Sequence, residues 1–161
     1  MVRVRLTTLG SLPPGVNICL QMVFLDVQKQ HMPITVCYHH SRGVDSNKLR
    51  SSIADFVFLL EKEDYSVISL YRIGDGHPIG IVSRPRLSAS GALKLELKIR
   101  FTDLSSCVGG INRQEVAVVF TLFQANTPLG VKYMPVKICK SPWRDIILEE
   151  ERKRQPTEVA P

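Results

Sequence analysis

The sequence predicts an all-β fold, an immunoglobulin-like antiparallel β-sandwich with large loops and one C-terminal helix. Three observations lead to this prediction. Apolar and polar residues alternate with a period of two along much of the chain, most clearly in residues 92–101. Short clusters of glycine, proline, serine and asparagine separate the alternating segments. The alternation stops near residue 140, where the sequence acquires the features of a helix start.

The strand pattern predicts antiparallel sheets with polar outer faces, and such sheets pack as two layers around a shared core. We expect strands at residues 3–9, 16–25, 55–61, 66–73, 78–83, 92–101, 115–123 and 130–140. Turn signals lie at residues 13–15, 74–76, 90–91 and 126–128. Two regions interrupt the pattern, loop 28–52 and loop 102–114. Long irregular loops in a compact sandwich usually carry function, so these two are candidate functional segments.

Residues 141–154 have the composition of a helix with a well-defined start. Ser141 can cap the first free amides, and Pro142 occupies the first helical position, where no backbone donor is needed. The charges suit the helix dipole, which favours acidic residues near the start of a helix and basic residues near its end. Asp145 lies in the first turn, and the basic residues 152–154 lie in the last. Ile146 and Ile147 add apolar surface, which we expect to pack against the sheet.

The length of 161 residues and the hydrophobic fraction of 44% suit one globular domain with its own core. We expect this domain at residues 2–154, followed by a disordered tail at residues 155–161. The net charge of +6 favours an anionic partner, nucleic acid first, although solvated lysines give the same balance. No apolar run reaches the roughly 18 to 20 residues of a membrane helix, so we expect an intracellular protein that does not bind membranes.

The sequence shows no catalytic arrangement, and we expect that the protein is not an enzyme. Its histidines do not fall near a serine or cysteine in a nucleophile motif, and a phosphate-binding glycine loop with its lysine is absent. The four cysteines, at positions 19, 37, 107 and 139, are too far apart to indicate a disulfide framework. They are either core thiols or metal ligands. Cys37 and His40 have the C-x-x-H spacing that can hold zinc from one loop.

Five motifs carry a resemblance to a known family. They are Pro-Pro-Gly at 13–15, Gln-His-Met at 30–32, Cys-Tyr-His-His at 37–40, Ser-Ser-Cys-Val-Gly-Gly-Ile-Asn-Arg at 105–113 and Val-Lys-Ile-Cys-Lys-Ser-Pro-Trp-Arg-Asp at 136–145. In this order they resemble the DNA-binding domain of the p53 tumour-suppressor family of transcription factors, over nearly the whole chain. The resemblance implies a β-sandwich whose two large loops and loop–sheet–helix end bind double-stranded DNA in a sequence-specific way.

The resemblance also implies one zinc ion per chain, held between the two loops. Cys37 and His40 match the ligands of the first loop, and Cys107 matches one of two cysteines in the second loop. Asp103 stands where the family has the other cysteine. Zinc accepts a carboxylate oxygen, so this set of four remains chemically possible, although it is harder than a site with three thiolates. In the alternative interpretation Asp103 ends a strand, the thiols are buried and no metal binds.

DNA-binding roles follow from the resemblance for six residues. They are Ser106 and Lys137 at phosphate-contacting positions, Lys140 as a further phosphate contact, Arg113 in the minor groove, Ser141 near the bases and Arg144 on a guanine in the major groove. Lys137 replaces an arginine and Ser141 a cysteine of the family motif. Gln114 replaces an arginine that braces the two loops against each other. The alternative is that these cations are only solvated beside a helix end.

The comparison with the family further implies that the chain starts inside the domain, without the first strands and without the tetramerisation segment. Self-association on DNA would then belong to the full-length protein, located in the nucleus and also in the cytoplasm. Two functions remain open. The chain is either the DNA-binding domain of a transcription factor or a truncated sandwich that pairs with family members or other proteins and binds DNA weakly.

Overall fold

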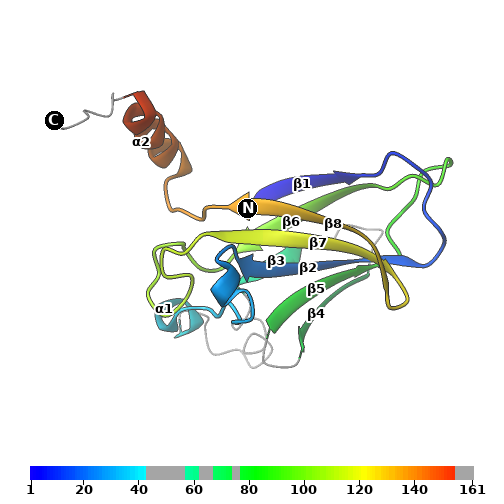
Figure 1. Ribbon diagram of the computed structural model, residues 1–161, viewed down its shortest axis with the longest axis horizontal. Coiled ribbons are helices and arrows are strands. Elements are labelled where there is room, and N and C mark those ends of the chain that lie inside the picture. Colours follow the sequence, from blue (N-terminus) through cyan, green and yellow to red (C-terminus); the bar gives the residue numbers. More distant parts are fainter. Residues whose placement is uncertain (43–56, 62–66, 74–76, 155–161) are drawn as a thin grey trace.

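The computed structural model describes residues 1–42, 57–61, 67–73 and 77–154. The described residues form two antiparallel sheets that pack face to face, and a C-terminal helix lies outside them (Figure 1). The strands are β1 (Val2–Thr7), β2 (Val16–Phe24), β3 (Phe58–Glu61), β4 (Val67–Ile73), β5 (His77–Ser83), β6 (Lys94–Phe101), β7 (Val116–Gln124) and β8 (Thr127–Val136). The helices are the 3₁₀ turn η1 (Val27–Lys29), α1 (Tyr38–Arg42) and α2 (Pro142–Arg154).

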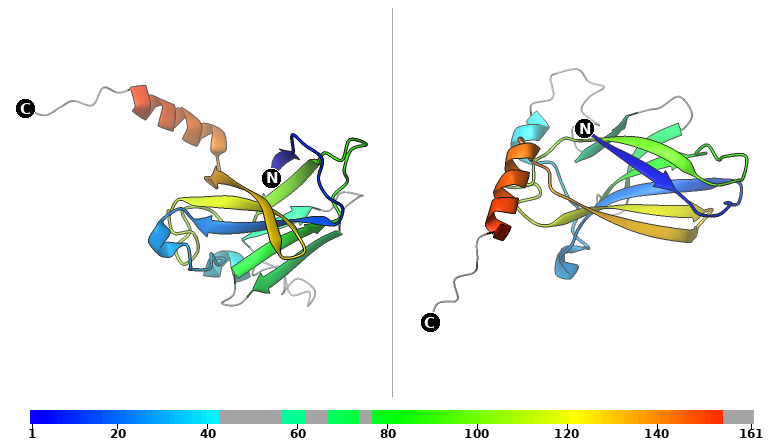
Figure 2. Two further views of the ribbon diagram at one scale, coloured as in Figure 1. Left: turned by 45° about the vertical axis from the view of Figure 1, so that its right-hand side comes forward. Right: turned by 90° about the horizontal axis from the view of Figure 1, so that it is seen from above.

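The sheets have three and five strands. The smaller sheet has the order β1-β6-β3, and the larger has the order β4-β5-β2-β7-β8. All strand pairs are antiparallel. The predicted all-β sandwich with one C-terminal helix is therefore confirmed, and the two views of Figure 2 show its two layers.

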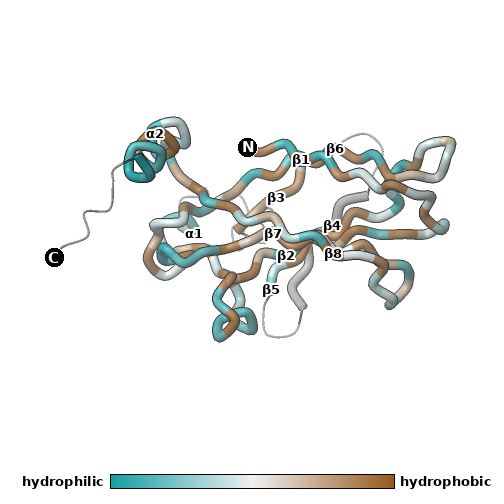
Figure 3. The backbone as a smooth tube through the Cα atoms, turned by 45° about the horizontal axis from the view of Figure 1, so that its top comes forward, coloured by the Kyte–Doolittle hydropathy of each residue, from teal (hydrophilic) through white to brown (hydrophobic). Residues whose placement is uncertain are grey.

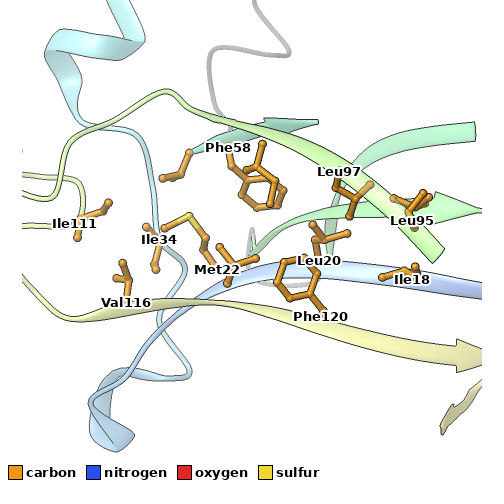
Figure 4. Close-up of a cluster of buried hydrophobic side chains, with 14 of the residues drawn as sticks. Ile18, Leu20, Met22, Ile34, Phe58, Leu95, Leu97, Ile111, Val116 and Phe120 are labelled. Atoms are coloured by element: carbon orange, nitrogen blue, oxygen red, sulfur yellow. The ribbon is translucent and has the colours of Figure 1, made fainter. Parts of the chain in front are cut away.

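The core between the sheets follows from the period of two in the strands. Every second residue of β2 is buried, as the alternation of its sequence predicts. Strand β6 repeats the pattern from Leu95 to Ile99, and Figure 3 shows apolar and polar positions alternating along the strands. Ile34 and Ile111, one from each long loop, complete the core at one end of the sandwich, near Met22 (Figure 4). Burial of these two side chains fixes both loops to the same end of the molecule.

Some strand bounds differ from the prediction. Strand β8 begins at Thr127, because the chain reverses at the preceding residues, where Ala125 has a φ of 51°. The strand ends at Val136 and not at residue 140, because Ile138 then bonds to loop 102–114 in place of a neighbouring strand. The first residues of the strands predicted at 55–61 and 66–73 lie outside the described residues, as do residues 43–52 of the first loop and the tail 155–161.

Helix α2 starts at Pro142, as predicted, and its first intrahelical bond runs from the Asp145 amide to the Ser141 carbonyl. The helix stands away from the sandwich (Figure 2), and none of its residues is buried. Ile146 is 51% exposed and Ile147 38% exposed, so the expectation that they pack against the sheet is wrong. Among the described residues, we find no helix with the length and apolar character needed to cross a membrane.

Replacement of Leu20 by alanine should lower the free energy of unfolding by roughly 2 to 5 kcal/mol, because it leaves a cavity around a side chain that is fully buried between the sheets. Urea denaturation gives the measurement. The control is Val131→Ala on the outer face of β8, where the side chain is 51% exposed, and a change within about 0.5 kcal/mol is expected. Equal losses in both variants would contradict the assigned core.

Candidate metal centre and groove surface

Four potential metal ligands converge where the two loops meet. Cys37 immediately precedes α1 and His40 lies in it, so the short helix places both side chains on the same side. Asp103 and Cys107 come from loop 102–114, just beyond the end of β6. The nearest ligand atoms of all four residues lie within 4.8 Å of one another. The structure thus brings together the four residues that the sequence assigned to a metal site.

The distances centre on one ring nitrogen. His40 Nδ1 lies 2.7 Å from Asp103 Oδ1, 3.1 Å from Cys37 Sγ and 3.4 Å from Cys107 Sγ. A neutral imidazole nitrogen carries either one proton or one lone pair and can complete only one good hydrogen bond. The nitrogen cannot form good hydrogen bonds with all three of the atoms around it. These atoms and the nitrogen fit better as the ligands of one shared metal cation. Two sulfurs, one nitrogen and one oxygen are also a chemically acceptable donor set for zinc.

Asp103 is the only buried charged residue among the described residues, with 1% exposure. Burial by itself would raise its pKa. The Cys107 thiol and the backbone amides of Cys37 and Leu104 donate hydrogen bonds to the carboxylate, and together these lower the pKa of Asp103 below its usual value. The group is therefore ionised at neutral pH and available as a ligand.

The pKa of Cys107 is shifted in the opposite direction, upward. Burial, together with its hydrogen bond to Asp103, raises the pKa of the Cys107 thiol to about 11. Zinc binds the thiolate, so metal binding here has to displace a proton from Cys107. In the metal-free protein the Asp103 carboxylate accepts a hydrogen bond that this thiol donates.

A groove of about 1080 Å³ lies between α2 and the nearby end of the sandwich. Its lining includes all six residues that the sequence assigned to DNA binding: Ser106, Arg113, Lys137, Lys140, Ser141 and Arg144. They come from loop 102–114, from the segment after β8 and from the first turn of α2. Arg152, from the last turn of α2, also lines the groove and was not singled out from the sequence. The tertiary structure therefore gathers segments that are about 30 residues apart on one surface.

Two contacts of Ser105 attach loop 102–114 to the segment after β8. The Ser105 amide donates to the Ile138 carbonyl at 2.8 Å, and the Ile138 amide donates to Ser105 Oγ at 2.8 Å. The Ser105 carbonyl in turn accepts the amide of Arg113. Arg113 and the preceding Asn112 both have left-handed backbones, with φ of 59° and 51°, so this bond holds Arg113 in a conformation that side-chain-bearing residues rarely adopt. The sequence does not single out Ser105, because nothing in the motif distinguishes it from Ser106.

Gln114, at a position where the resemblance implies a bracing arginine, joins the two loops. Its side-chain oxygen accepts a hydrogen bond of 2.8 Å from Lys29 Nζ, at the end of η1. Lys29 also lies 3.7 Å from the Asp26 carboxylate, which caps η1. The end of the second loop is thus attached to the start of the first by a polar contact between different residue types.

The ion pairs in the groove are weak and solvent-exposed. Lys137 lies 3.6 Å from Glu149, and Arg144 lies 3.8 Å from the neighbouring Asp145. Exposed pairs of this kind contribute at most about 1 kcal/mol. Both cations can therefore exchange their partners for an external anion at little cost.

Comparisons with known proteins found two similarities. A family model described as P53 DNA-binding domain matches residues 1–153. The chain is also similar to cellular tumor antigen p53 of Oryzias latipes, with 43% identity over 51 residues. That alignment covers 32% of this chain and spans only 14% of the relative's length.

Replacement of Ser105 by alanine should destabilise the protein by about 1 to 2 kcal/mol, because the Ile138 amide loses its acceptor in a partly buried position. Thermal or urea unfolding monitors the change. Ser106→Ala is the matched control at the adjacent, exposed serine, and its stability should stay within about 0.5 kcal/mol. If both variants unfold like the parent protein, the attachment of the loop to Ile138 contributes no stability.

Proposed function

The chain belongs to the family of p53 DNA-binding domains, which are non-enzymatic domains of sequence-specific transcription factors, and from this premise we propose that it binds double-stranded DNA through the groove surface beside α2. The convergence of six sequence-assigned residues on that groove is the observation that carries the proposal. Loop 102–114, the segment after β8 and the first turn of α2 supply them to the same groove, so one duplex can contact all three.

The charge of the groove supports an anionic ligand. Its basic side chains are Arg113, Lys137, Lys140, Arg144 and Arg152, against the acidic Glu115, Asp145 and Glu149. Two of the acidic residues lie beside basic ones in exposed pairs. Phosphates would replace these carboxylates as partners of Lys137 and Arg144, and release of counterions from the DNA would add to the affinity.

The residues divide into reading and anchoring roles. Arg144, at the start of α2, reads a guanine through the two-pronged geometry of its guanidinium. Lys137, Lys140 and Ser106 anchor phosphates, and Ser141 donates near the bases. Arg113, held by the left-handed turn of its loop, enters a narrow minor groove. The lysine at position 137 keeps the positive charge of the family's arginine but lacks the planar guanidinium that can form two parallel hydrogen bonds with a phosphate.

One zinc ion per chain would be held by Cys37, His40, Asp103 and Cys107. The close approach of their ligand atoms supports this part of the proposal. The ion would tie loop 102–114 to α1 and thereby hold Arg113 in place on the groove surface. Because a carboxylate replaces one thiolate, we expect a lower zinc affinity than a site with three cysteines would have.

The wider context is also part of the proposal. Residues 2–154 form the DNA-binding domain, and the protein acts in the nucleus. Self-association of the full-length protein would bring several copies onto one DNA site, and such multivalency raises the overall affinity without new contacts.

A protein-interaction module is the second candidate, and exposed apolar residues of α2 favour it. Trp143 is 76% exposed and Ile146 51% exposed on this helix, which makes contact with another protein chemically plausible. Under this alternative the groove would bind DNA only weakly, without preference for sequence.

Protein purified without chelator should contain about one equivalent of zinc, and the variants His40→Ala and Cys107→Ser should lose most of it, because each removes a ligand of the four-residue site. Elemental analysis of folded protein gives the stoichiometry. Cys139→Ser serves as the control, since this thiol lies outside the cluster. A zinc content below about a tenth of an equivalent in the well-folded parent protein would rule out the site.

Arg144→Ala should weaken binding to a duplex selected from a random pool by about 1 to 3 kcal/mol, with relaxed preference at one guanine. Lys137→Ala should weaken all duplexes alike and reduce the slope of log affinity against log salt by about one. Arg113→Ala should matter most where the minor groove is narrow. Titrations across a salt series, with selected and scrambled duplexes, give these values.

Arg5→Ala on β1 is the control for these titrations, because Arg5 is exposed and pairs with Glu96, away from the groove lining. It should leave affinity and salt slope nearly unchanged. Equal affinity for selected and scrambled duplexes, with the groove variants unchanged, would favour the interaction module.

A further inference from the structure

The Asp103 carboxylate uses its two oxygens for different purposes. Oδ2 accepts a hydrogen bond of 2.8 Å from the backbone amide of Cys37, 66 residues earlier in the chain. Oδ1 accepts from the amide of the adjacent Leu104 at 2.9 Å and lies 2.7 Å from His40 Nδ1. One oxygen therefore binds the backbone of the other loop, and the second lies beside the His40 ring nitrogen of the metal-ligand cluster.

The surroundings of the carboxylate are shaped to hold it. A Cβ atom at Gly110 would collide with Asp103 Oδ2 and lie 3.2 Å from the Cys37 amide. Only glycine at position 110 leaves space for the carboxylate and its donor. The contact is also shielded from water, since Asp103 is 1% exposed and Cys37 is 1% exposed. A hydrogen bond from a buried amide to a charged acceptor is among the strong ones in proteins.

We propose that Asp103 is a metal-independent clasp, which keeps loop 102–114 attached to the segment before α1 when no metal is bound. The Oδ2–Cys37 amide bond joins the two loops with atoms that metal coordination does not require. Metal loading would then stiffen an arrangement that already exists. The clasp does not depend on the DNA-binding function proposed above or on the identity of the metal.

A cysteine at position 103 could not replace the clasp. Sulfur is a weak hydrogen-bond acceptor, whereas a carboxylate offers two oxygens with about four acceptor sites. A site with a thiolate at this position would gain metal affinity. It would also leave the Cys37 amide buried without a good acceptor in the metal-free state. The aspartate thus gives weaker metal binding but a metal-free state that stays ordered.

Amide hydrogen exchange at Cys37, measured by NMR on the full chain stripped with EDTA and verified as zinc-free, tests the clasp. The parent protein should protect this amide both without metal and after addition of zinc. Asp103→Cys should exchange roughly 10- to 100-fold faster without metal, as expected for loss of a strong hydrogen bond, and should regain protection with zinc. His40→Ala, which removes a metal ligand but leaves Oδ2 in place, should keep the amide protected.

A second pair of variants covers the case in which Asp103→Cys does not fold. Gly110→Ala should displace the carboxylate and speed exchange at Cys37, although all four ligand residues remain. Gly130→Ala in β8 is the control, because a Cβ atom there meets nothing within 4 Å. This variant should leave the exchange rate of the Cys37 amide unchanged.

The outcomes separate the clasp from the zinc site. Protection of Cys37 in a parent protein that takes up no zinc would support the clasp and remove zinc from the proposed function. Exchange in the zinc-free parent that is as fast as in Asp103→Cys or Gly110→Ala, or rapid exchange in zinc-free His40→Ala, would overturn the clasp.

Discussion

A loop that leaves a β-sheet must find new partners for its backbone polar groups, and this requirement organises the functional end of the protein. After β6 the chain no longer has a neighbouring strand, yet it crosses the end of the sandwich with Asp103 and Ile111 buried. Asp103 and Ser105 supply the partners that are needed. The first binds the amide of Cys37 and the second exchanges two hydrogen bonds with Ile138. Three segments far apart in the chain are thereby fixed to one another.

The groove surface depends on the same short segment. Through its carbonyl, Ser105 holds the amide of Arg113, and through Ile138 it holds the stretch that leads into α2. Helix α2 has no buried residue, and its links to the preceding segment include the exposed pair of Lys137 with Glu149 and a hydrogen bond between the side chains of Cys139 and Asp145. A helix with so little packing can adjust its position at low cost, which suits contact with a large ligand such as a duplex.

The four-residue cluster shows what an aspartate adds at a position where the family resemblance implies a cysteine. As a candidate ligand the Asp103 carboxylate is harder than a thiolate, and it also places a second acceptor oxygen within the core. Gly110, which leaves space for that oxygen, and the buried amide of Cys37, which donates to it, match the carboxylate. Gln114 shows a similar exchange, since its contact with Lys29 joins the loops by an uncharged acceptor. Both positions keep the two loops joined with altered residue types.

The sequence by itself determined the sandwich, most strand positions and the start of α2, because alternation, turn residues and the Ser141–Pro142 start act locally. The residues of both candidate sites came from the resemblance of five motifs to the p53 family, with the C-x-x-H spacing of Cys37 and His40 as the one local signal. It could not determine where β8 ends, since Ile138 bonds to a loop residue 33 positions away. It also misjudged Ile146 and Ile147, because helix periodicity does not reveal whether a sheet lies within reach. Only the tertiary structure decided that the Asp103 carboxylate binds the Cys37 backbone and that Arg113 and Arg144 share a groove. Contacts between distant segments depend on how the loops cross the end of the core, and no short sequence pattern encodes that path.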